Sequence, residues 1–565
     1  MTAWQDMTIW ERFIDEHARL KELRNVMDAS REVIAEQFRP DIVNEKGVGQ
    51  FTGMDIIEGT GPWALGVMTR GLLGSLAGPS FTWIQYTVPE PIFKGHDAIN
   101  KWLQEYREHM EPAYRRSTFY DIMPGYVAEG LSIGSPVTVI EEDVVSGRSV
   151  FHRPHYERCW FDRDIFGDVN VLHVEHDYSH LTASTRFGKE MLSTTTQDEL
   201  KEGNHTKTSK FLQVFYPPEH PIFDDLKIPI EIPEGTKCLM FYIEKDASET
   251  EKQRPLSQDS YYSKPYVVWD YRRNADEICA RTPAWDAMVD VKTHNAQWKT
   301  TLKSGQRRGD PAIIALDTQR GKLRLGPGAR NYVTTQEYDR SPKPAFDAPH
   351  SFTETEYLLN TSAQSLRRHF FVSVFMKIEE YQRQHRQPPS ATEILAMEGE
   401  NAPQIGPAVQ STERGLLGPI DERMMSIEGE AGRLPPPPDE WLEYTQRGDV
   451  HPVFVGPIAV AQKSSMSIRE LDVFFAIAEK FVTLDEMLVH KMDLPVAMED
   501  ALEKSNIPQG WLKSQEAYEA IVERIAEQQA QQELIEQAGA VAEGAGKIMG
   551  PTDPTSPLAA IAQEA

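Results

Sequence analysis

The sequence has few cysteines, and it lacks both a long apolar run and an obvious secretion signal. Its three cysteines, Cys159, Cys238 and Cys279, are widely spaced in 565 residues, so they do not make a disulfide framework and indicate a reducing compartment. No window approaches the run of about 18 uncharged apolar residues that a membrane helix needs. The N-terminal residues do not join a basic region to an apolar run, so we expect neither a signal peptide nor a membrane partner.

Basic residues are also scarce relative to acidic ones. The chain has 59 lysines and arginines against 86 aspartates and glutamates, which gives a net charge of −27. This balance argues against a protein that wraps nucleic acid by neutralising phosphates, because such a protein would be basic. It remains compatible with a protein that encloses DNA without gripping it, since an acidic wall repels phosphate.

Motifs for catalysis are missing as well. There is no Gly-x-x-x-x-Gly-Lys-[Ser/Thr] loop and no Gly-x-Ser-x-Gly turn between a strand and a helix. One group of side chains has ligand types that suit zinc and would make the protein a zinc-dependent hydrolase. Its members are His152, His155, Cys159, His173, His176 and His180. Against this alternative, His173 and His176 have opposite parity on one predicted strand and would face opposite sides of it.

The order of predicted elements indicates an α+β protein. With 40% apolar and 26% charged residues the composition is that of a globular protein, long enough for about three to four domains. Helical periodicity covers 4–38, 60–78 and 96–130. The period then changes to that of short strands separated by Gly, Asp and Pro. These strands are predicted at 137–140, 150–152, 156–161, 169–176, 211–216, 238–244 and 266–271.

The stretch from Arg281 to Gly432 organises the rest of the chain. A helix starts at Pro283 and is expected to end near Gly305, and an insert over 306–350 with candidate strands at 312–316 and 322–325 follows. A second helix starts near the capping box Thr353-Glu-Thr-Glu356. The apolar stripes of the two helices are Trp285, Met288, Val289, Val291, Ala296, Trp298 and Leu302, and Tyr357, Leu358, Leu359, Ala363, Leu366, Phe370, Phe371 and Val374.

A polar loop follows the second helix. Pro388-Pro389 blocks helix continuation, so 375–389 is predicted as a loop, and a third helix starts at the capping box Ser390-Ala-Thr-Glu393. Four prolines at 435–438 then form an extended connector, and a strand is predicted from Val453. Further helices are predicted from Ser467 and over 513–538, and the last 25 or so residues are small and Pro-rich.

The chain resembles the head-to-tail connector, or portal, proteins of short-tailed bacteriophages. The resemblance runs in order from the Trp10-Glu-Arg-Phe helix to the helix after Ser467, and it is weakest past about Leu484. Each matching piece is short, and their order and number make the match specific. The pieces are Gly61-Pro-Trp-Ala with Leu72-Leu-Gly, Arg116-Ser-Thr-Phe-Tyr120, Gly134-Ser-Pro-Val-Thr-Val-Ile-Glu-Glu-Asp143, Pro265-Tyr-Val-Val-Trp269, Arg281-Thr-Pro-Ala-Trp-Asp-Ala, Asp290-Val-Lys-Thr-His-Asn295, Ser390-Ala-Thr-Glu393, Leu417-Gly-Pro-Ile, Leu434-Pro-Pro-Pro-Pro438 and Pro457-Ile-Ala-Val-Ala-Gln-Lys463.

This resemblance implies a portal fold, in which an α/β wing carries two stem helices that flank a small clip. The implied segments are an N-terminal wing at 1–280, a first stem helix at 281–306, the clip at 307–350, a second stem helix at 351–374, a tunnel loop at 375–389, a long helix behind it at 390–432, a returning wing segment at 433–484, a helical crown at 485–540 and a flexible tail at 541–565.

The resemblance also implies a function without an enzymatic activity, a metal or a cofactor. Twelve subunits would form a ring at one capsid vertex, and double-stranded DNA would pass through its channel, independent of sequence, during packaging and ejection. A largely acidic channel would keep the DNA from sticking. The implied protein partners are the major capsid protein, the scaffold, the terminase large subunit, the tail adaptor and internal core proteins. The protein would be assembled in the host cytoplasm and reside in the virion, at the head-tail junction.

Two groups of side chains are the implied sites. The tunnel loop carries Lys377, Gln382, Arg383, His385 and Arg386, and we hypothesise that its bases touch phosphates weakly and act as a brake on DNA. The alternative is that these bases pair with Glu379 and Glu380 of a neighbouring loop. In the clip, Arg307 and Arg308 would face the terminase first and the tail adaptor later.

Overall fold

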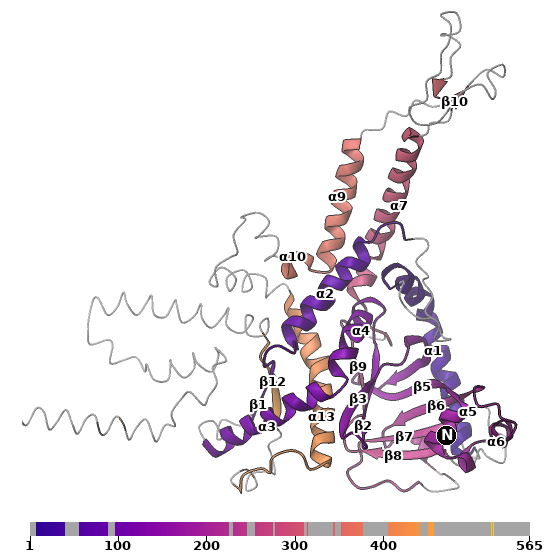
Figure 1. Ribbon diagram of the computed structural model, residues 1–565, viewed down its shortest axis with the longest axis vertical. Helices are drawn as coiled ribbons and strands as arrows, with labels where there is room; N and C mark the ends of the chain where they lie inside the picture. Colours follow the sequence, from indigo (N-terminus) through magenta and orange to yellow (C-terminus); the bar gives the residue numbers. More distant parts are fainter. Residues whose placement is uncertain are drawn as a thin grey trace, which may run out of the picture.

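The structure is a computed structural model in which an α+β body carries a pair of projecting helices (Figure 1). The α+β class predicted from the sequence is confirmed. The residues that the structure describes are 7–39, 56–88, 97–224, 226, 230–245, 255–274, 277–309, 313–314, 343–344, 352–376, 405–439, 441, 450–456, 521 and 524.

The N-terminal part of the body is helical. Its helices are α1 (Ile9–Phe38), α2 (Thr60–Leu76), α3 (Asp97–Arg116) and α4 (Phe119–Ser132). The helices predicted over 4–38 and 60–78 are confirmed, and the helical prediction over 96–130 is confirmed as two helices. The Ser117 hydroxyl donates to the Tyr114 carbonyl (2.7 Å) and accepts from the Phe119 amide (3.1 Å). This local bonding replaces helical bonds and divides the segment in two.

Two antiparallel sheets form the rest of the body. The larger has the order β4-β5-β6-β7-β8 and the smaller the order β3-β2-β9. The strand bounds are β2 Val137–Asp143, β3 Arg148–His152, β4 Cys159–Arg163, β5 Val169–Ser179, β6 Thr208–Tyr216, β7 Cys238–Glu244, β8 Ser257–Tyr261 and β9 Tyr266–Val268. The predicted strands are confirmed with two changes: Tyr156–Arg158 form a 3-10 helix ahead of β4, and the strand predicted over 266–271 ends at Val268. Strand β8 was missed because an edge strand that reads Ser-Gln-Asp-Ser-Tyr lacks apolar alternation.

Short helices surround the strands of the larger sheet. They are α5 (His180–Phe187), α6 (Thr194–Lys201) and the one-turn 3-10 helices Tyr156–Arg158, Lys189–Met191 and Pro221–Phe223. The larger sheet is buried on both faces. Phe13 of α1 packs on Tyr216 and Phe241 of one face, with ring centroids 5.3 Å apart in both pairs. On the other face, Met240 and Tyr242 share a core with the smaller sheet. Every residue of β7 is therefore buried.

A second core joins the helices to segments that are distant in the sequence. Strand β1 (Ile84–Thr87) pairs antiparallel with β12 (His451–Phe454), which brings the chain after the four prolines back to the body. Trp269 is fully buried, and its ring lies against the Cα atoms of Gly130 and Gly415, where a β-carbon would collide or crowd it. The second glycine lies in a π-helix (Glu413–Leu417) that continues residues 405–412 and leads into α13 (Gly418–Glu430).

The projecting helices are α7 (Pro283–Gly309) and α9 (Phe352–His369). The predicted start at Pro283 is confirmed, but the end expected at Gly305 is wrong, because the helix continues through that glycine to Gly309. A single glycine costs a helix only about 1 kcal/mol. Of the predicted clip strands, the first corresponds to β10 (Ile313–Ile314), which pairs with β11 (Lys343–Pro344). The second, at 322–325, lies outside the described residues, as does the predicted helix start at Ser390.

The second helix is also shorter than its apolar stripe predicts. It ends at His369, because Phe371 has a left-handed backbone (φ 49°), and a short helix α10 (Val372–Phe375) follows. Such a conformation is uncommon for a bulky residue and is retained only where surrounding packing fixes it. Here the Phe375 ring fills the space over Gly71 of α2, and Phe370 is buried. The apolar run of the sequence therefore extends past the end of α9, because its aromatic rings pack against the body there.

A buried carboxyl group connects α13 to two other elements of the body. Asp421 Oδ1 accepts hydrogen bonds from Tyr86 of β1 (2.9 Å) and Tyr114 of α3 (2.8 Å), while Oδ2 has no hydrogen-bond partner among the described residues. Complete burial raises the pKa of Asp421 to about 7, although the two tyrosine hydroxyls oppose this shift. The folded state therefore binds this proton more tightly than the unfolded state does. Stability falls as pH rises from about 4 to about 7 and is level above that range.

Replacing Asp421 by asparagine keeps the shape of this side chain and removes its charge. We expect Asp421→Asn to raise the free energy of unfolding by about 1–3 kcal/mol at about pH 8, because no buried carboxylate remains. The measurement is the melting temperature of wild type and variant between about pH 5 and pH 8. As pH rises to about 7, the melting temperature of the wild type should fall relative to that of the variant, and above about pH 7 the difference should stay constant. Tyr86→Phe, which keeps the carboxyl group, should retain the wild-type dependence. Parallel curves over the whole range would contradict the assignment.

Candidate functional site

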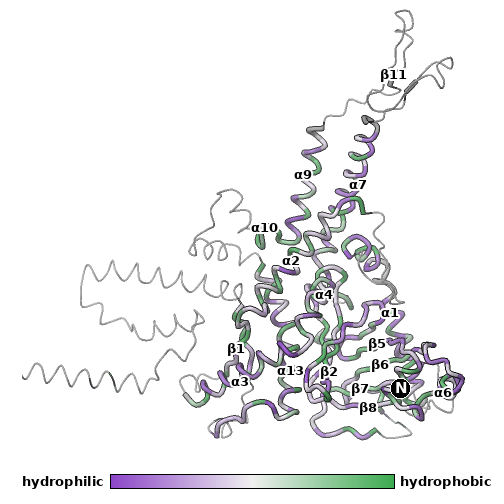
Figure 2. Tube along the Cα trace, in the orientation of Figure 1, coloured by the Kyte–Doolittle hydropathy of each residue, from purple (hydrophilic) through white to green (hydrophobic). Residues whose placement is uncertain are grey.

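Helices α7 and α9 lie side by side and antiparallel, and together they form a rod that extends from the body (Figure 1). Figure 2 shows hydrophobic and hydrophilic residues interleaved along both helices of this rod. At a rise of about 1.5 Å per residue, the 27 residues of α7 span roughly 40 Å. The rod contains the residues to which the resemblance assigns the two stem helices.

Polar side chains hold the two helices together. Asp290 Oδ2 of α7 accepts from the Ser365 hydroxyl (2.6 Å) and lies 3.0 Å from His369 Nε2. One turn further along α7, His294 Nδ1 lies 2.6 Å from the Ser362 hydroxyl, which also lies 2.9 Å from Gln297 Oε1. We call this set of side chains the polar ladder. Its members are Asp290, His294, Gln297, Ser362, Ser365 and His369. Because each bond needs a partner at one height, the ladder fixes the register of the helices.

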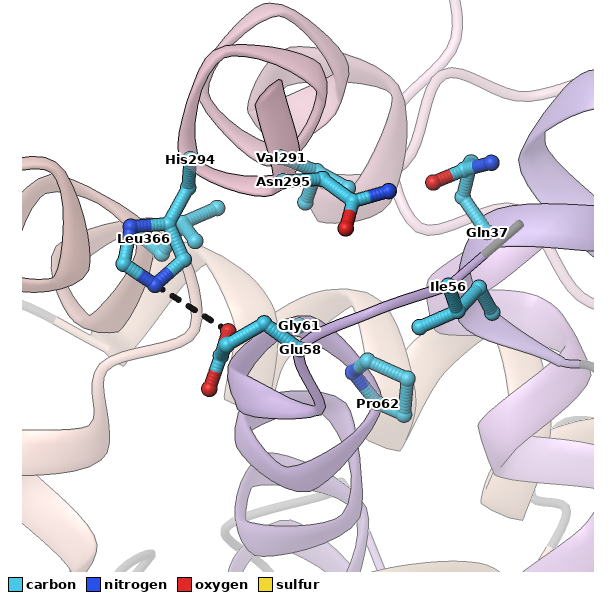
Figure 3. Close-up of a pocket in the computed structure, with 9 residues that line it drawn as sticks. All are labelled: Gln37, Ile56, Glu58, Gly61, Pro62, Val291, His294, Asn295 and Leu366. Carbon is cyan, nitrogen blue, oxygen red and sulfur yellow. Dashed lines mark ion pairs between the residues drawn. The ribbon is translucent and has the colours of Figure 1, made fainter. Parts of the chain in front are cut away.

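The base of the rod is fixed to the body beside the polar ladder. His294 Nε2 lies 3.0 Å from the carboxylate of Glu58, which precedes α2 (Figure 3). Burial lowers the pKa of His294, and Glu58 partly opposes this. The space between these side chains has room for about one water molecule, so it is a junction rather than a substrate cleft. Its lining residues are Gln37, Ile56, Glu58, Gly61, Pro62, Val291, His294, Asn295 and Leu366.

Several residues of the predicted apolar stripes face solvent instead of a core. Val289 and Leu302 of α7 are 74% and 45% exposed, and Tyr357 and Leu358 of α9 are 70% and 51% exposed. The predicted stripes are thus apolar, but the same subunit does not cover all of their residues. Periodicity identifies an apolar face but not what covers it. Leu302, Tyr357 and Leu358 lie where the rod extends beyond the body, whereas Val289 is exposed although it lies nearer the body.

One exposed face of α7, which we call the free face, carries a stripe of four uncharged side chains. Val289, Thr293, Ala296 and Thr300 follow one another at spacings of four, three and four residues and share one stripe. The hydroxyls of Thr293 and Thr300 donate to carbonyls of their own helix at 2.8 Å and 2.9 Å. Thr361 of α9 does the same at 2.8 Å. The stripe therefore presents mainly methyl groups.

The histidines that suggested zinc are held apart by other partners. His173 Nε2 lies 2.6 Å from the Tyr216 hydroxyl on one face of β5, and His176 Nε2 lies 2.9 Å from Gln213 Oε1 on the other. His180 Nε2 lies 3.0 Å from the Ser209 hydroxyl. Burial lowers the pKa of His173 well below its usual range and that of His176 to about 4, so both are neutral at neutral pH.

The remaining members of that group do not complete a metal site. His152 is exposed near Glu141, and the His155 ring accepts from the Glu157 amide (3.4 Å). Burial raises the pKa of the Cys159 thiol to about 12, which opposes the thiolate that zinc needs. Within the ranges that the structure describes, no group of three or more His, Cys, Asp or Glu side chains is placed to hold a metal ion. The zinc-dependent hydrolase is therefore not favoured.

The structure describes only part of the tunnel-loop and clip residues that the sequence analysis named. Lys377, Gln382, Arg383, His385 and Arg386 lie outside the described residues. Arg307 and Arg308 lie in the last turn of α7 by their backbone, and their side chains are not described. The sequence reasoning missed the polar ladder, although Asp290, Ser362 and Ser365 lie among the residues of the two apolar stripes. Polar residues that recur on the facing sides of two neighbouring helices are the signal that could have identified it.

The chain matches a protein family over most of its length. A family model described as "Bacteriophage head to tail connecting protein" matches residues 11–512. The chain therefore belongs to the family of bacteriophage head-to-tail connecting proteins. The resemblance stated from sequence motifs is confirmed, and membership indicates a structural component of the virion at the connection between head and tail. None of the described helices is long and apolar enough to cross a membrane.

Two curated relatives carry the more specific name of portal protein. The chain is 22% identical over 424 residues to a "Probable portal protein" of Bordetella phage BPP-1, which covers 75% of this chain and 73% of the relative. It is 20% identical over 516 residues to the "Portal protein" of Salmonella phage epsilon15, covering 90% and 89%. The similarity thus includes the body and the rod together.

The polar ladder predicts that the rod depends on one carboxylate. Asp290→Ala leaves the Ser365 hydroxyl and the His369 ring without their acceptor, so we expect a loss of about 1–2 kcal/mol in the free energy of unfolding. Asp286→Ala is the matched control, because it removes the same group from the same helix but breaks only a surface pair with Arg272 (2.9 Å). Thermal melting compares the two. Equal effects of the two variants would show that the ladder does not stabilise the rod.

Proposed function

We propose that copies of this chain close into a ring at one capsid vertex and that the α7–α9 rods form the wall of its DNA channel. The observation that carries the proposal is the rod itself, which is fixed to the body at one end and leaves apolar side chains exposed along its length. Exposed apolar residues on a projecting element favour contacts with other molecules. In a ring of twelve, as the resemblance implies, each rod would lie between two neighbours.

The free face of α7, which carries the stripe from Val289 to Thr300, suits the passage of DNA. A duplex carries one negative charge per ~1.7 Å of its axis, and proteins that hold DNA do so with lysine and arginine. The stripe from Val289 to Thr300 is uncharged, and its threonine hydroxyls are bonded within the helix. A wall lined by this stripe neither grips phosphates nor repels them. We therefore propose an uncharged wall along the rod in place of the largely acidic channel expected from net charge.

The other segments receive their proposed roles from the family. We assign the tunnel loop to 375–389 and keep its basic residues as the proposed brake on DNA. The clip over 307–350, with Arg307 and Arg308, would bind the terminase large subunit during packaging and the tail adaptor afterwards. The first stem helix is best extended to Gly309, where α7 ends. The proposed crown at 485–540 would face the capsid interior, toward the scaffold and internal core proteins, and the major capsid protein would surround the wing.

Purified protein tests the ring directly. We expect native mass spectrometry to show a closed oligomer of about twelve chains, and electron microscopy to show a central hole bordered by the rods. Asp421→Asn serves as a control, because it lies inside the body and should leave assembly unchanged. A monomer at concentrations typical of capsid assembly, or rings whose rods lie on the outer rim, would contradict the proposal.

Lysines placed on the free face test the wall. In phage particles, Thr293→Lys combined with Thr300→Lys should slow DNA packaging or ejection severalfold, because the new cations bind passing phosphates, and added salt should relieve the effect. Thr185→Lys on α5 combined with Thr195→Lys on α6 is the control, because it adds the same two charges at exposed sites away from the rod. DNA content and ejection rate measure the outcome. If the rod variant behaves like the control at low salt, the free face does not line the channel.

A further inference from the structure

The rod has two outer edges that differ in charge. On α7, Asp290 and His294 face α9 through the polar ladder, and Lys299 and Lys303 each lie nine residues later. At about 100° per residue, nine residues turn the helix by about half a circle, so both lysines lie on the edge opposite α9. On α9, Glu356 lies nine residues before the ladder residue Ser365 and so lies on the edge opposite α7.

These charged side chains have no ionic partner among the described residues of the same subunit. Lys299, Lys303 and Glu356 are exposed, and none of them makes an ion pair or a hydrogen bond with its side chain in the part of the chain that the structure describes. By contrast, Asp286 at the base of the rod pairs with Arg272 at 2.9 Å. One edge of the rod is therefore basic and the other acidic over its outer half.

The two edges also lie at the same height along the rod. The ladder places Asp290 opposite Ser365 and His294 opposite Ser362. Because the helices are antiparallel, a residue of α7 and a residue of α9 at the same height have residue numbers that add up to about 656. By this register, Glu356 is level with about residue 300 of α7, between Lys299 and Lys303. A copy related by rotation about an axis along the rods keeps every residue at its height. The acidic edge of one rod then meets the basic edge of the next at matching positions.

We propose that Lys299 and Lys303 of one copy pair with Glu356 of the neighbouring copy, and that this seam closes the ring in one direction. The inference rests on the proposed ring and names the contact between its subunits. A head-to-tail interface needs two different, complementary surfaces on each subunit, which the two edges supply. Two basic edges placed against each other, as in a two-fold dimer, would repel, so the charges also select cyclic assembly over pairing.

The proposed seam is limited to the outer half of the rod. Nearer the body, Arg367 of α9 lies with its guanidinium 5.5 Å from the ring centroid of Trp63 of α2. That arginine is exposed, but its guanidinium stacks on an aromatic ring of the body. The seam begins where the rods extend beyond the body, and among the described side chains there, Lys299, Lys303 and Glu356 are the exposed charges on the two edges.

Charge reversal tests the seam. Lys299→Glu with Lys303→Glu makes both edges acidic, and Glu356→Lys makes both edges basic, so each variant alone should need a roughly tenfold higher protein concentration to form rings at low salt. Combining all three substitutions in one chain restores opposite edges and should restore rings. Lys189→Glu, an exposed lysine of the body, is the control for net charge and should assemble like wild type.

Mixing the two defective variants gives the sharpest result. In an equimolar mixture at low salt, every acidic edge can meet a basic edge only if the two variants alternate around the ring. We expect native mass spectrometry to show rings with equal numbers of each variant, which also demonstrates that both variants are folded. Rings of either variant alone at wild-type concentrations, or no mixed rings, would overturn the seam and leave the ring intact. Absence of rings from the wild-type chain would instead overturn the proposed function.

Discussion

The antiparallel pairing of α7 and α9 is the constraint on which the rest of the structure depends. Apolar faces alone would let two helices slide past each other, because hydrophobic contact has no direction. The bonds that Asp290 accepts from α9, and the bond between His294 and Ser362, are possible at one register only. Every statement about which side chains of the rod face outward, and at what height, follows from that register.

The body holds this pair at a defined angle. Glu58 reaches His294 at the base of the rod, and Val291 packs over Gly61 and near Phe38 of α1, where a β-carbon on the glycine would crowd both side chains. Helix α1 is fixed in turn to the larger sheet through Phe13 and through the Trp10 indole, which donates to the Glu244 carbonyl (2.9 Å). The sheet thus positions the rod through α1, although the two do not need to touch.

The proposed ring would explain why the rod leaves groups exposed that the rest of the chain buries. Large apolar side chains remain on its surface, and Lys299, Lys303 and Glu356 make no ion pair in the part of the chain that the structure describes. The larger sheet, by contrast, buries its aromatic rings and pairs Glu175 with Lys210 and Lys245. A subunit that contacts neighbours along its rod can leave such groups exposed. The body packs its core within one chain and can fold before the proposed ring closes.

The sequence by itself determined the family, the α+β class and the start of α7 at Pro283, because these depend on short motifs and on local periodicity. Only the tertiary structure decided where helix 96–130 divides, why α9 ends before Phe371, and that His173 and His176 serve separate faces of the sheet. It also decided which face of each helix of the rod is exposed. Tyr357 and Leu366 belong to the same apolar stripe in the sequence, but only Leu366 is buried. The physical reason is the distance along the chain over which each interaction acts. Helix signals act within a few residues. The hydrogen bond between Ser365 and Asp290, by contrast, joins two helices separated by an insert of about 40 residues, which no local pattern spans.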